Sequence, residues 1–301
     1  MDPSSSQPLV SIILPTKNRA TLLARAVKSV LAQTHTNIEL ILVDEGSSDE
    51  TPDVVKRIAD ARVKPFRNEV SRGPGAARNA GIEASEGDFI AFLDDDDEFL
   101  PNKLKDQVKA FETSVGSVGI VISPVQTFRN GKPVDYFPYN GESGNVFLNV
   151  LAGHTFPLSA ILVRRNALAA FDDKLTCLED VDFCLKVVQL TKAMYSESPC
   201  ALVHLDDNRK RLSTDRVNLH RSFRSLQSRW FNDPNDSLLR NAQADLFVNF
   251  ALRQFALGNF DEATREYLNR AYALKKDGRR LMYRLQNMAG PSVLKWLYAK
   301  T

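Results

Sequence analysis

The chain has 301 residues, of which 43% are hydrophobic and 25% are charged, and its formal net charge is +2. This composition is typical of a soluble globular protein, and the length suffices for one large domain or two smaller ones. The charge is too close to neutral to favour nucleic acid as a partner, and none is expected. The chain has three cysteines without C-x-x-C spacing, which argues against a disulfide framework or a zinc site and favours the reducing cytoplasm.

The start of the chain, MDPSSSQPLV, has no basic stretch followed by an apolar one, so no signal peptide is expected. The sequence also has no run of about 18 apolar residues, so it predicts no membrane-spanning helix. Together with the cysteines, these features favour a cytoplasmic location.

The first third of the chain alternates between short apolar runs and segments of helical periodicity. The expected strands are residues 10–14, 38–43, 63–66 and 89–93, and two expected helices lie at about residues 21–33 and 52–60. Residues 71–85 are expected to form a Gly-rich turn that runs into a third helix. Strands that alternate with helices indicate βαβ units and a mostly parallel sheet. Ligands of such sheets bind at the carboxyl ends of the strands.

Polar side chains follow three of these strands. Thr16 and Lys17 follow the first strand, Asp44 and Glu45 end the second, and the acid run DDDDE, residues 94–98, ends the fourth. Because the carboxyl ends of parallel strands share one edge of a sheet, the three clusters are predicted to form one site.

The acid run places five carboxylates directly after a buried strand. Two unit charges about 5 Å apart repel each other by roughly 3 kcal/mol at an effective dielectric constant near 20. Either water solvates this turn or a divalent cation offsets the repulsion. Asp94 and Asp96 share one side of an extended chain, which suits Mg²⁺ or Mn²⁺ together with a phosphate-bearing substrate. Asp97 and Glu98 are expected to be solvated.

After residue 100 the sequence contains fewer segments with a strand pattern. We expect a helix from Pro101 to about residue 112, strands at 119–123 and 160–163, and a hairpin turn at Asn130-Gly131. From about residue 217 the spacing is helical throughout, and a turn at Gly258-Asn259 suggests one tetratricopeptide-like helix pair. The polar stretch DDNRKRLSTD separates residues 1–207 from an all-helical region, residues 208–301.

Four stretches, in this order, resemble the family 2 glycosyltransferases of the GT-A fold: VSIILPTKNR, ELILVDEGSSDET, GPGAARNAGIEASEGDFIAFLDDDDEFLPNKL and FDDKLTCLEDVDFCLKV. The resemblance spans roughly residues 10–205. It implies an α/β, Rossmann-like fold with a mostly parallel sheet flanked by helices. It also implies an inverting transferase that uses a UDP-, GDP- or dTDP-linked sugar and Mn²⁺ or Mg²⁺, and that acts on a saccharide or lipid-linked saccharide.

The resemblance also assigns site residues. Those that match the nucleotide-sugar site are Pro15, Thr16, Lys17, Asp44, Glu45, Arg72, Arg78, Asp94 and Asp95. Asp96 matches the metal ligand, and His204 is a second candidate ligand. Glu45 departs from the family's aspartate, and its extra methylene shifts the carboxylate by about one C–C bond.

A Glu-Asp pair near the end of the resemblance supplies the catalytic residues. Asp180 matches the general base that deprotonates the acceptor hydroxyl, and Glu179 is expected to orient Asp180 or to cap its helix. Lys186 stands where the family usually has arginine, and it is expected to affect the packing of that helix.

Several alternatives stay open at this point. Arg72 and Arg78 suit the bracing of a turn as well as nucleotide binding, and His204 suits a structural role. A degenerate nucleotide-sugar domain that displays a helical tail for protein binding is the rival function, and a nucleotidyltransferase is a weaker one. The basic and aromatic residues after residue 217 suit either packing on the domain or peripheral contact with an anionic membrane. The sequence does not predict an oligomeric state.

Overall fold

The computed structural model describes residues 7–114, 116–134, 141, 143–206, 216–233, 235–256 and 262–275. The chain forms two compact units, of which the first comprises Met1–Val146 and Phe156–Phe223 and the second comprises Phe147–Thr155 and Arg224–Thr301. The predicted boundary after residue 207 and the predicted turn at Gly258-Asn259 lie outside the described residues, so both stay predictions.

The first unit is built on a seven-stranded sheet with the order β10-β6-β9-β4-β1-β2-β3. Its strands are β1 (Val10–Thr16), β2 (Ile38–Glu45), β3 (Val63–Asn68), β4 (Phe89–Phe92), β6 (Val118–Ile122), β9 (Ile161–Arg164) and β10 (Lys192–Tyr195). Only β9 runs antiparallel to its neighbours, β4 and β6. The mostly parallel sheet that the sequence predicts is confirmed.

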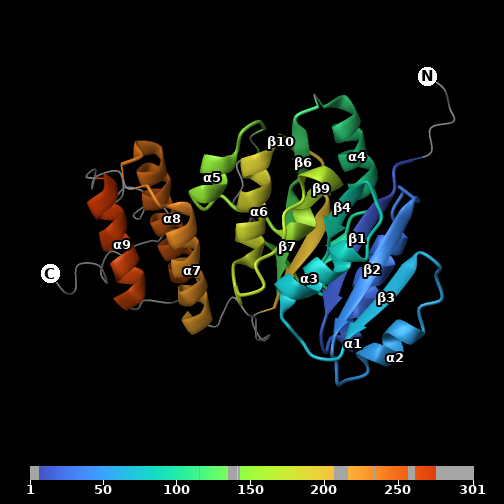
Figure 1. The fold of residues 1–301 in the computed structure, drawn as a ribbon. Helices are drawn as coiled ribbons and strands as arrows, with labels where there is room; N and C mark the ends of the chain where they lie inside the picture. Colours follow the sequence, from blue (N-terminus) through green and yellow to red (C-terminus); the bar gives the residue numbers. More distant parts are fainter. Residues whose placement is uncertain are drawn as a thin grey trace. The chain divides into compact units, whose positions relative to one another are not determined.

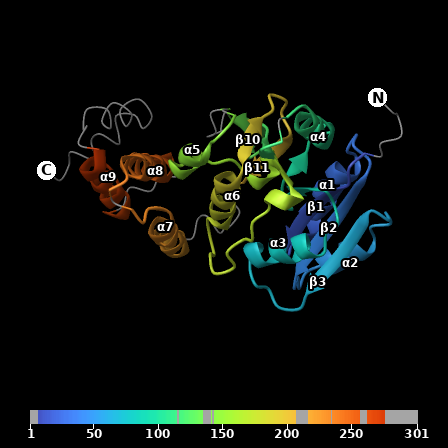
Figure 2. The ribbon, with the colours of Figure 1, turned by 45° about the horizontal axis from the view of Figure 1, so that its top comes forward.

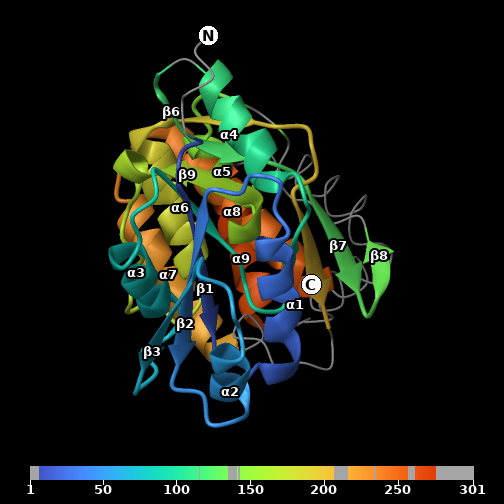
Figure 3. The same cartoon turned by 90° about the vertical axis from the view of Figure 1, so that its right-hand side faces the viewer.

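Helices cover both faces of this sheet (Figures 1 and 3). They are α1 (Ala20–Leu31), α2 (Thr51–Lys56), α3 (Pro74–Glu83), α4 (Lys103–Thr113) and α6 (Glu179–Leu190). Helices α1 and α2 lie on one face of β1–β3 and α3 lies on the other, as right-handed crossovers on both sides of β1 require (Figure 3). Glycine at position 81 allows the close approach of α3, since a Cβ there would lie 2.4 Å from Cγ2 of Ile13 on β1.

A second, four-stranded sheet has the order β5-β11-β7-β8. Its strands are β5 (Glu98–Phe99), β7 (Val125–Arg129), β8 (Lys132–Val134) and β11 (Ala201–Leu205). The β7–β8 turn at Asn130-Gly131 has positive φ at both residues, 49° and 77°, which suits a tight hairpin and confirms the predicted turn. The sequence reasoning missed β5, β10 and β11.

The helices α7 (Arg216–Trp230), α8 (Ser237–Ala256) and α9 (Glu262–Lys275) follow the helical pattern that the sequence shows from about residue 217, and α7 begins in the first unit. The short helix α5 (Phe147–Leu151) was not predicted. In the second unit α8 lies between α9 and α5 (Figures 1 and 2). Asn249 Nδ2 on α8 donates a hydrogen bond to the carbonyl of Ala152, 2.7 Å away. No helix among the described residues is both long and apolar enough to cross a membrane.

Lys103, at the start of α4, is a lysine inside the core of the first unit. Its side chain is 1% exposed. The ammonium donates to Oε1 of Gln107 (2.7 Å) and to the carbonyl of Ile161 (3.2 Å), and it lies 4.7 Å from the centre of the Phe99 ring. Burial lowers the pKa of Lys103 to about 8. The folded state therefore holds a charge that burial disfavours at neutral pH.

We expect this charge to make stability depend on pH. The folded pKa of Lys103 lies below the ordinary value of 10.5, so between these two pH values the unfolded chain binds more protons than the folded one. Wild-type stability should therefore rise with pH across this window, relative to Lys103→Met, by up to about 3 kcal/mol. Urea unfolding of both proteins at about pH 7 and about pH 10 measures the difference.

The matched control is Lys105→Met, because Lys105 is exposed on the same helix. The difference in unfolding free energy between Lys105→Met and the wild type should be the same at about pH 7 and at about pH 10. If the Lys103→Met difference were equally flat, the lysine would not titrate as a buried group.

Candidate active site

The polar residues that end β1, β2 and β4 meet at one edge of the main sheet. In the parallel register Thr16 on β1 lies opposite Asp44 on β2. The pairing of Ile13 with Phe92 carries the same register into β4 and brings Asp95 beside Thr16. The Thr16 hydroxyl donates to Oδ2 of Asp95 over 2.7 Å. The three clusters therefore share one edge, as the sequence predicts.

The carboxyl group of Asp95, in the acid run, has a raised pKa. Burial raises its pKa to about 7, and the neighbouring charges of Asp96 and Asp94 add to this rise. The hydrogen bond from Thr16 and the guanidinium of Arg19, whose Nε lies 3.8 Å from Oδ1, oppose it. The protein therefore gathers negative charge here and neutralises it only in part.

Asp94 and Asp96 have arginine neighbours. Nη2 of Arg78 donates to Oδ1 of Asp94 over 2.8 Å, and Nη2 of Arg25 donates to the backbone carbonyl of Asp96 over 2.7 Å. One arginine comes from α3 and the other from α1, so helices on opposite faces of the sheet hold the turn of the acid run.

The expected solvation of Asp97 is wrong. Asp97 is 5% exposed, and its Oδ1 accepts a hydrogen bond from the backbone N–H of His204 over 3.0 Å. Glu98 is half-buried, and its Oε1 lies 2.9 Å from Nε2 of His204 and 3.3 Å from Nε of Arg25. The cause is the second sheet, which brings β11 against the end of the acid run. The role of His204 as a metal ligand stays a prediction.

The acid run offers oxygen ligands, which suit a hard divalent cation. Among the described residues, no three or more His, Cys, Asp or Glu side chains form a group that could hold a metal ion. Mg²⁺ in enzymes is often bound through one or two carboxylates, with water and substrate phosphates completing its shell. The partly neutralised charge around Asp95 fits a cation of this kind, bound together with a phosphate-bearing substrate.

Asp44, at the end of β2, is buried and paired inside the protein. Its Oδ2 forms an ion pair with Nη1 of Arg67, the residue opposite it on β3. Its Oδ1 accepts a hydrogen bond from the backbone N–H of Ser47 over 3.0 Å. Asp44 therefore braces the loop after β2, and its contact with a nucleotide stays a prediction.

Glu45 reaches the segment that leads into α3. One carboxylate oxygen accepts a hydrogen bond from the side-chain amide of Asn68, and the other accepts one from the backbone N–H of Arg72 over 2.8 Å. The Arg72 guanidinium itself is largely exposed and lies 3.6 Å from Asp173. The glutamate thus holds residues 68–72 close to the strand end.

Pro15 lies within β1, opposite Val43 of β2, and not in the loop that follows the strand. Lys17 is the first residue after β1, and it is exposed. Asn18 follows with φ 53°, a left-handed conformation that asparagine tolerates better than most residues. Its N–H donates to Oγ of Ser47 (2.9 Å), and its Oδ1 accepts from the N–H of Ser48 (2.8 Å). Asn18 therefore joins the loops after β1 and β2. The sequence analysis missed this residue, although an asparagine directly after a strand is a turn signal.

The predicted base lies in the first turn of α6. Glu179 is buried, Asp180 is partly exposed, and Leu178 before them is left-handed with φ 62°. Nη1 of Arg78 donates to Oε1 of Glu179 over 2.8 Å. Burial, followed by the charge of Asp180, raises the pKa of Glu179, while Arg78 opposes the rise. One arginine therefore pairs with Glu179 and with Asp94 of the acid run.

Asn79 is a second residue that the sequence analysis missed. Its side-chain amide donates to the carbonyl of Phe171 (2.9 Å) and accepts from the N–H of the same residue (2.8 Å). This reciprocal pair ties the segment before α6 to α3. Further along α6, Lys186 bonds to the carboxylate of the fully buried Asp182 (2.7 Å) and to the carbonyl of Ala170 (3.0 Å).

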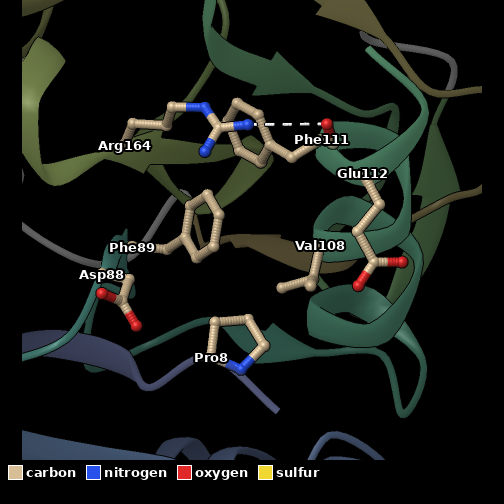
Figure 4. Close-up of a pocket in the computed structure, with 7 residues that line it drawn as sticks. All are labelled: Pro8, Asp88, Phe89, Val108, Phe111, Glu112 and Arg164. Carbon is tan, nitrogen blue, oxygen red and sulfur yellow. Dashed lines mark hydrogen bonds between the residues drawn. The ribbon is translucent and has the colours of Figure 1, made fainter. Parts of the chain in front are cut away.

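A separate hollow of about 330 Å³ opens at the amino end of β4, away from the acid run (Figure 4). The Arg164 guanidinium lies over the rings of Phe89 and Phe111, 5.2 and 4.5 Å from their centres. The remaining lining residues are Pro8, Asp88, Val108 and Glu112. This hollow lies at the opposite edge of the sheet from the candidate site.

Solved structures of glycosyltransferases share this fold. The Staphylococcus aureus protein TarS in complex with UDP-GlcNAc matches 90% of this chain and 91% of its own, with 19% identity and a TM-score of 0.61. The mannosyltransferase PcManGT of Pyrobaculum calidifontis, in complex with GDP-Man and Mn²⁺, matches 99% of this chain and 89% of its own, with 18% identity and a TM-score of 0.61. These likenesses confirm the predicted GT-A fold.

Curated relatives are similar in sequence. An uncharacterized glycosyltransferase of Haemophilus influenzae is 31% identical over 213 residues, which cover 66% of this chain and 80% of the relative. The Escherichia coli protein WfgD, a UDP-Glc:alpha-D-GlcNAc-diphosphoundecaprenol beta-1,3-glucosyltransferase, is 43% identical over 100 residues, which cover 33% of this chain and 40% of the relative.

The sequence model described as "Glycosyl transferase family 2" matches residues 11–169, which is more than half of the chain. The match begins in β1 and includes the ends of β1, β2 and β4. The chain therefore belongs to glycosyltransferase family 2, the enzymes that transfer a sugar from a nucleotide sugar, and the resemblance found in its motifs is confirmed.

Proposed function

We propose that this glycosyltransferase moves a sugar from a nucleoside-diphosphate sugar to a hydroxyl group, with inversion and with the help of Mn²⁺ or Mg²⁺. One observation carries the proposal: Arg78 bonds both to Asp94 of the acid run and to Glu179 beside the proposed base, each over 2.8 Å. This bridge supports the proposal that the acid run, with the metal ligand Asp96, and the base Asp180 act in one site.

The donor would bind along the carboxyl edge, beside Pro15, Thr16, Lys17, Asp44, Glu45, Arg72, Asp94 and Asp95. A UDP-, GDP- or dTDP-linked sugar is proposed, because structural neighbours hold UDP-GlcNAc and GDP-Man. Asp96 and His204 are the proposed metal ligands. The cation would supply positive charge that stabilises the departing diphosphate.

Asp180 would remove the proton from the acceptor hydroxyl as that oxygen attacks the anomeric carbon. Attack occurs on the face opposite the leaving diphosphate, so one displacement inverts the anomeric configuration. The first turn of α6 stabilises the negative charge that such a base needs. Glu179 would orient this turn rather than touch the acceptor.

The acceptor is proposed to be a saccharide or a lipid-linked saccharide, since the relative WfgD acts on a diphosphoundecaprenol-linked sugar. An acceptor in a membrane would require the protein to reach the cytoplasmic membrane surface, and residues 217–301 are the proposed contact. Residues 276–301 of that region lie outside the described part of the chain. Sedimentation with anionic vesicles tests this contact.

A donor assay tests the proposed function. The purified protein is incubated with UDP-, GDP- and dTDP-linked sugars in Mn²⁺, in Mg²⁺ or in EDTA, and released nucleoside diphosphate is measured. We expect release from donors of one nucleotide class, and we expect EDTA to abolish it. If the protein binds nucleotides but turns over none of the donors, the result would favour the rival function, a non-catalytic binding protein.

A further inference from the structure

We infer that Arg78 is a positioning residue, which holds the base-bearing turn of α6 against the acid run and does not bind the nucleotide. The inference rests on the proposed function, because it concerns how that site is assembled. It also differs from the role in nucleotide binding that the resemblance implies for Arg78.

The geometry of the guanidinium supports this role. The Arg78 side chain is only 7% exposed, and its two terminal nitrogens are directed to different partners, Asp94 and Glu179. These partners are 85 positions apart in the sequence, since Asp94 lies in the turn after β4 and Glu179 begins α6. The guanidinium therefore bridges two parts of the site and leaves little surface for a ligand.

Stability alone does not account for this arrangement. Nε of Arg78 is buried without a hydrogen-bond partner among the described residues. A buried donor that makes no hydrogen bond lowers stability, and a buried ion pair is often no more stable than apolar residues of similar volume. The arrangement is better explained by a function that needs these two carboxylates at a set separation.

Aromatic packing beneath the guanidinium fixes the same two elements. The Arg78 guanidinium lies 5.5 Å from the centre of the Phe171 ring. That ring stacks on Phe183 of α6, with centres 4.2 Å apart, and meets the edge of Phe92 of β4 at 5.5 Å. An apolar cluster and a charged bridge therefore join the end of β4 to the start of α6.

The backbone before α6 needs such a support. Leu178 has φ 62°, a conformation that is unfavourable for a leucine and persists only where its surroundings enforce it. Asn79, beside Arg78 on α3, holds Phe171 through two hydrogen bonds. Neighbouring residues of α3 thus hold both ends of the segment 171–179, and Asp180 follows directly.

Removal of the guanidinium leaves Asp94 and Glu179 without the positive charge between them. Glu179 would move, and the turn that carries Asp180 would shift with it. The acid run keeps the hydrogen bonds from Arg25 to the carbonyl of Asp96 and from Thr16 to Asp95. Misplacement of a catalytic group by about 1 Å can lower a rate on the order of a hundredfold. The positioning role therefore predicts a loss of kcat, with little change in nucleotide affinity.

The test compares Arg78→Lys, Arg78→Met, Glu179→Gln and the double variant that combines Arg78→Met with Glu179→Gln. Donor turnover gives kcat and KM, and calorimetric titrations with UDP, GDP and dTDP in Mn²⁺ give Kd. Circular dichroism and thermal unfolding show which variants fold. Arg164→Met is the matched control, because the Arg164 guanidinium also packs on phenylalanine, in its case Phe89 and Phe111, but at the opposite edge of the sheet (Figure 4).

We expect Arg78→Met and Glu179→Gln each to lower kcat about a hundredfold, with every nucleotide Kd within about threefold of wild type. The double variant should be no slower than the single ones, because either change removes the same ion pair between residues 78 and 179. Arg78→Lys should recover part of the loss in kcat, since a lysine ammonium keeps the positive charge. It lacks the second terminal nitrogen with which the guanidinium reaches both carboxylates. Arg164→Met should keep kcat.

Two results would overturn the inference. A nucleotide Kd weakened tenfold or more at unchanged kcat would mean that Arg78 binds the nucleotide, and an unchanged kcat in the folded variants would mean that the bridge is only structural. If Arg78→Met does not fold, Arg78→Lys and Glu179→Gln decide by the same criteria. A wild-type protein that turns over no donor contradicts the proposed function itself.

Discussion

Asp180→Asn is expected to lower kcat for sugar transfer about a thousandfold and to leave nucleotide binding unchanged. Asparagine has the size of aspartate but cannot take a proton from the acceptor hydroxyl. One oxygen of Asp180 accepts a hydrogen bond from the N–H of Val181 over 2.8 Å, and the amide oxygen of asparagine can keep this bond. The variant should therefore fold as the wild type does and lose only the proton transfer.

The measurement is donor turnover together with calorimetric nucleotide binding. Asp106→Asn is the matched control, because Asp106 also lies in the first turn of a helix, α4, and its loss removes the same favourable interaction with the helix dipole. The control should keep the wild-type kcat. A wild-type rate in Asp180→Asn would mean that another group removes the proton.

The second large effect concerns the cation. Asp96→Ala should lower donor turnover about a thousandfold, since the metal contributes several kcal/mol of charge stabilisation to the departing diphosphate. The variant should also need more Mn²⁺ for half-maximal activity. EDTA should have the same effect on the wild type, and added Mn²⁺ should reverse it.

A Mn²⁺ titration of activity makes the comparison. Asp88→Ala is the control, because Asp88 lies at the other end of β4 and lines the hollow at the amino edge (Figure 4). Asp88→Ala should need the same Mn²⁺ concentration as the wild type for half-maximal activity. An Asp96→Ala protein with an unchanged Mn²⁺ requirement would show that the ligand lies elsewhere.

The inner strands of the central sheet could be predicted because they are nearly continuous apolar runs, as strands buried on both faces must be. The edge strand β10 has no such run and was missed. Residues 38–45 are buried throughout, and so are residues 89–92. The shared edge of Thr16, Asp44 and Asp95 followed from strand direction alone. The local hydrophobic pattern was therefore enough to predict a strand wherever that strand is buried on both faces.

The partners of the site residues could not be predicted in this way. Asp97 is buried by a strand that begins more than a hundred positions later, β11, and the two-residue strand β5 has no pattern of its own. The ion pair between Asp44 and Arg67 depends on the register of β2 with β3. Such contacts arise from tertiary pairing, which the periodicity of a single segment does not encode.

The same limit applies to the division of the chain. The sequence suggests a cut near residue 207, because composition changes there, but Phe147–Thr155 also belongs to the second unit. Its helix α5 is short, and the partner that buries it, α8, lies far away in the sequence. A change in amino-acid composition can locate one boundary along the chain. It does not reveal that an earlier segment packs with a unit that follows much later in the sequence.

That discontinuity has a consequence for biosynthesis. Helix α5 leaves the ribosome well before α8 has been translated. The apolar side chains of Val150 and Leu151, which are buried in the folded protein, therefore stay exposed until α8 packs against α5. A fragment that stops at residue 207 would expose them permanently and would be prone to aggregate. A protein expressed for biochemical work should therefore include α8 as well as the first unit.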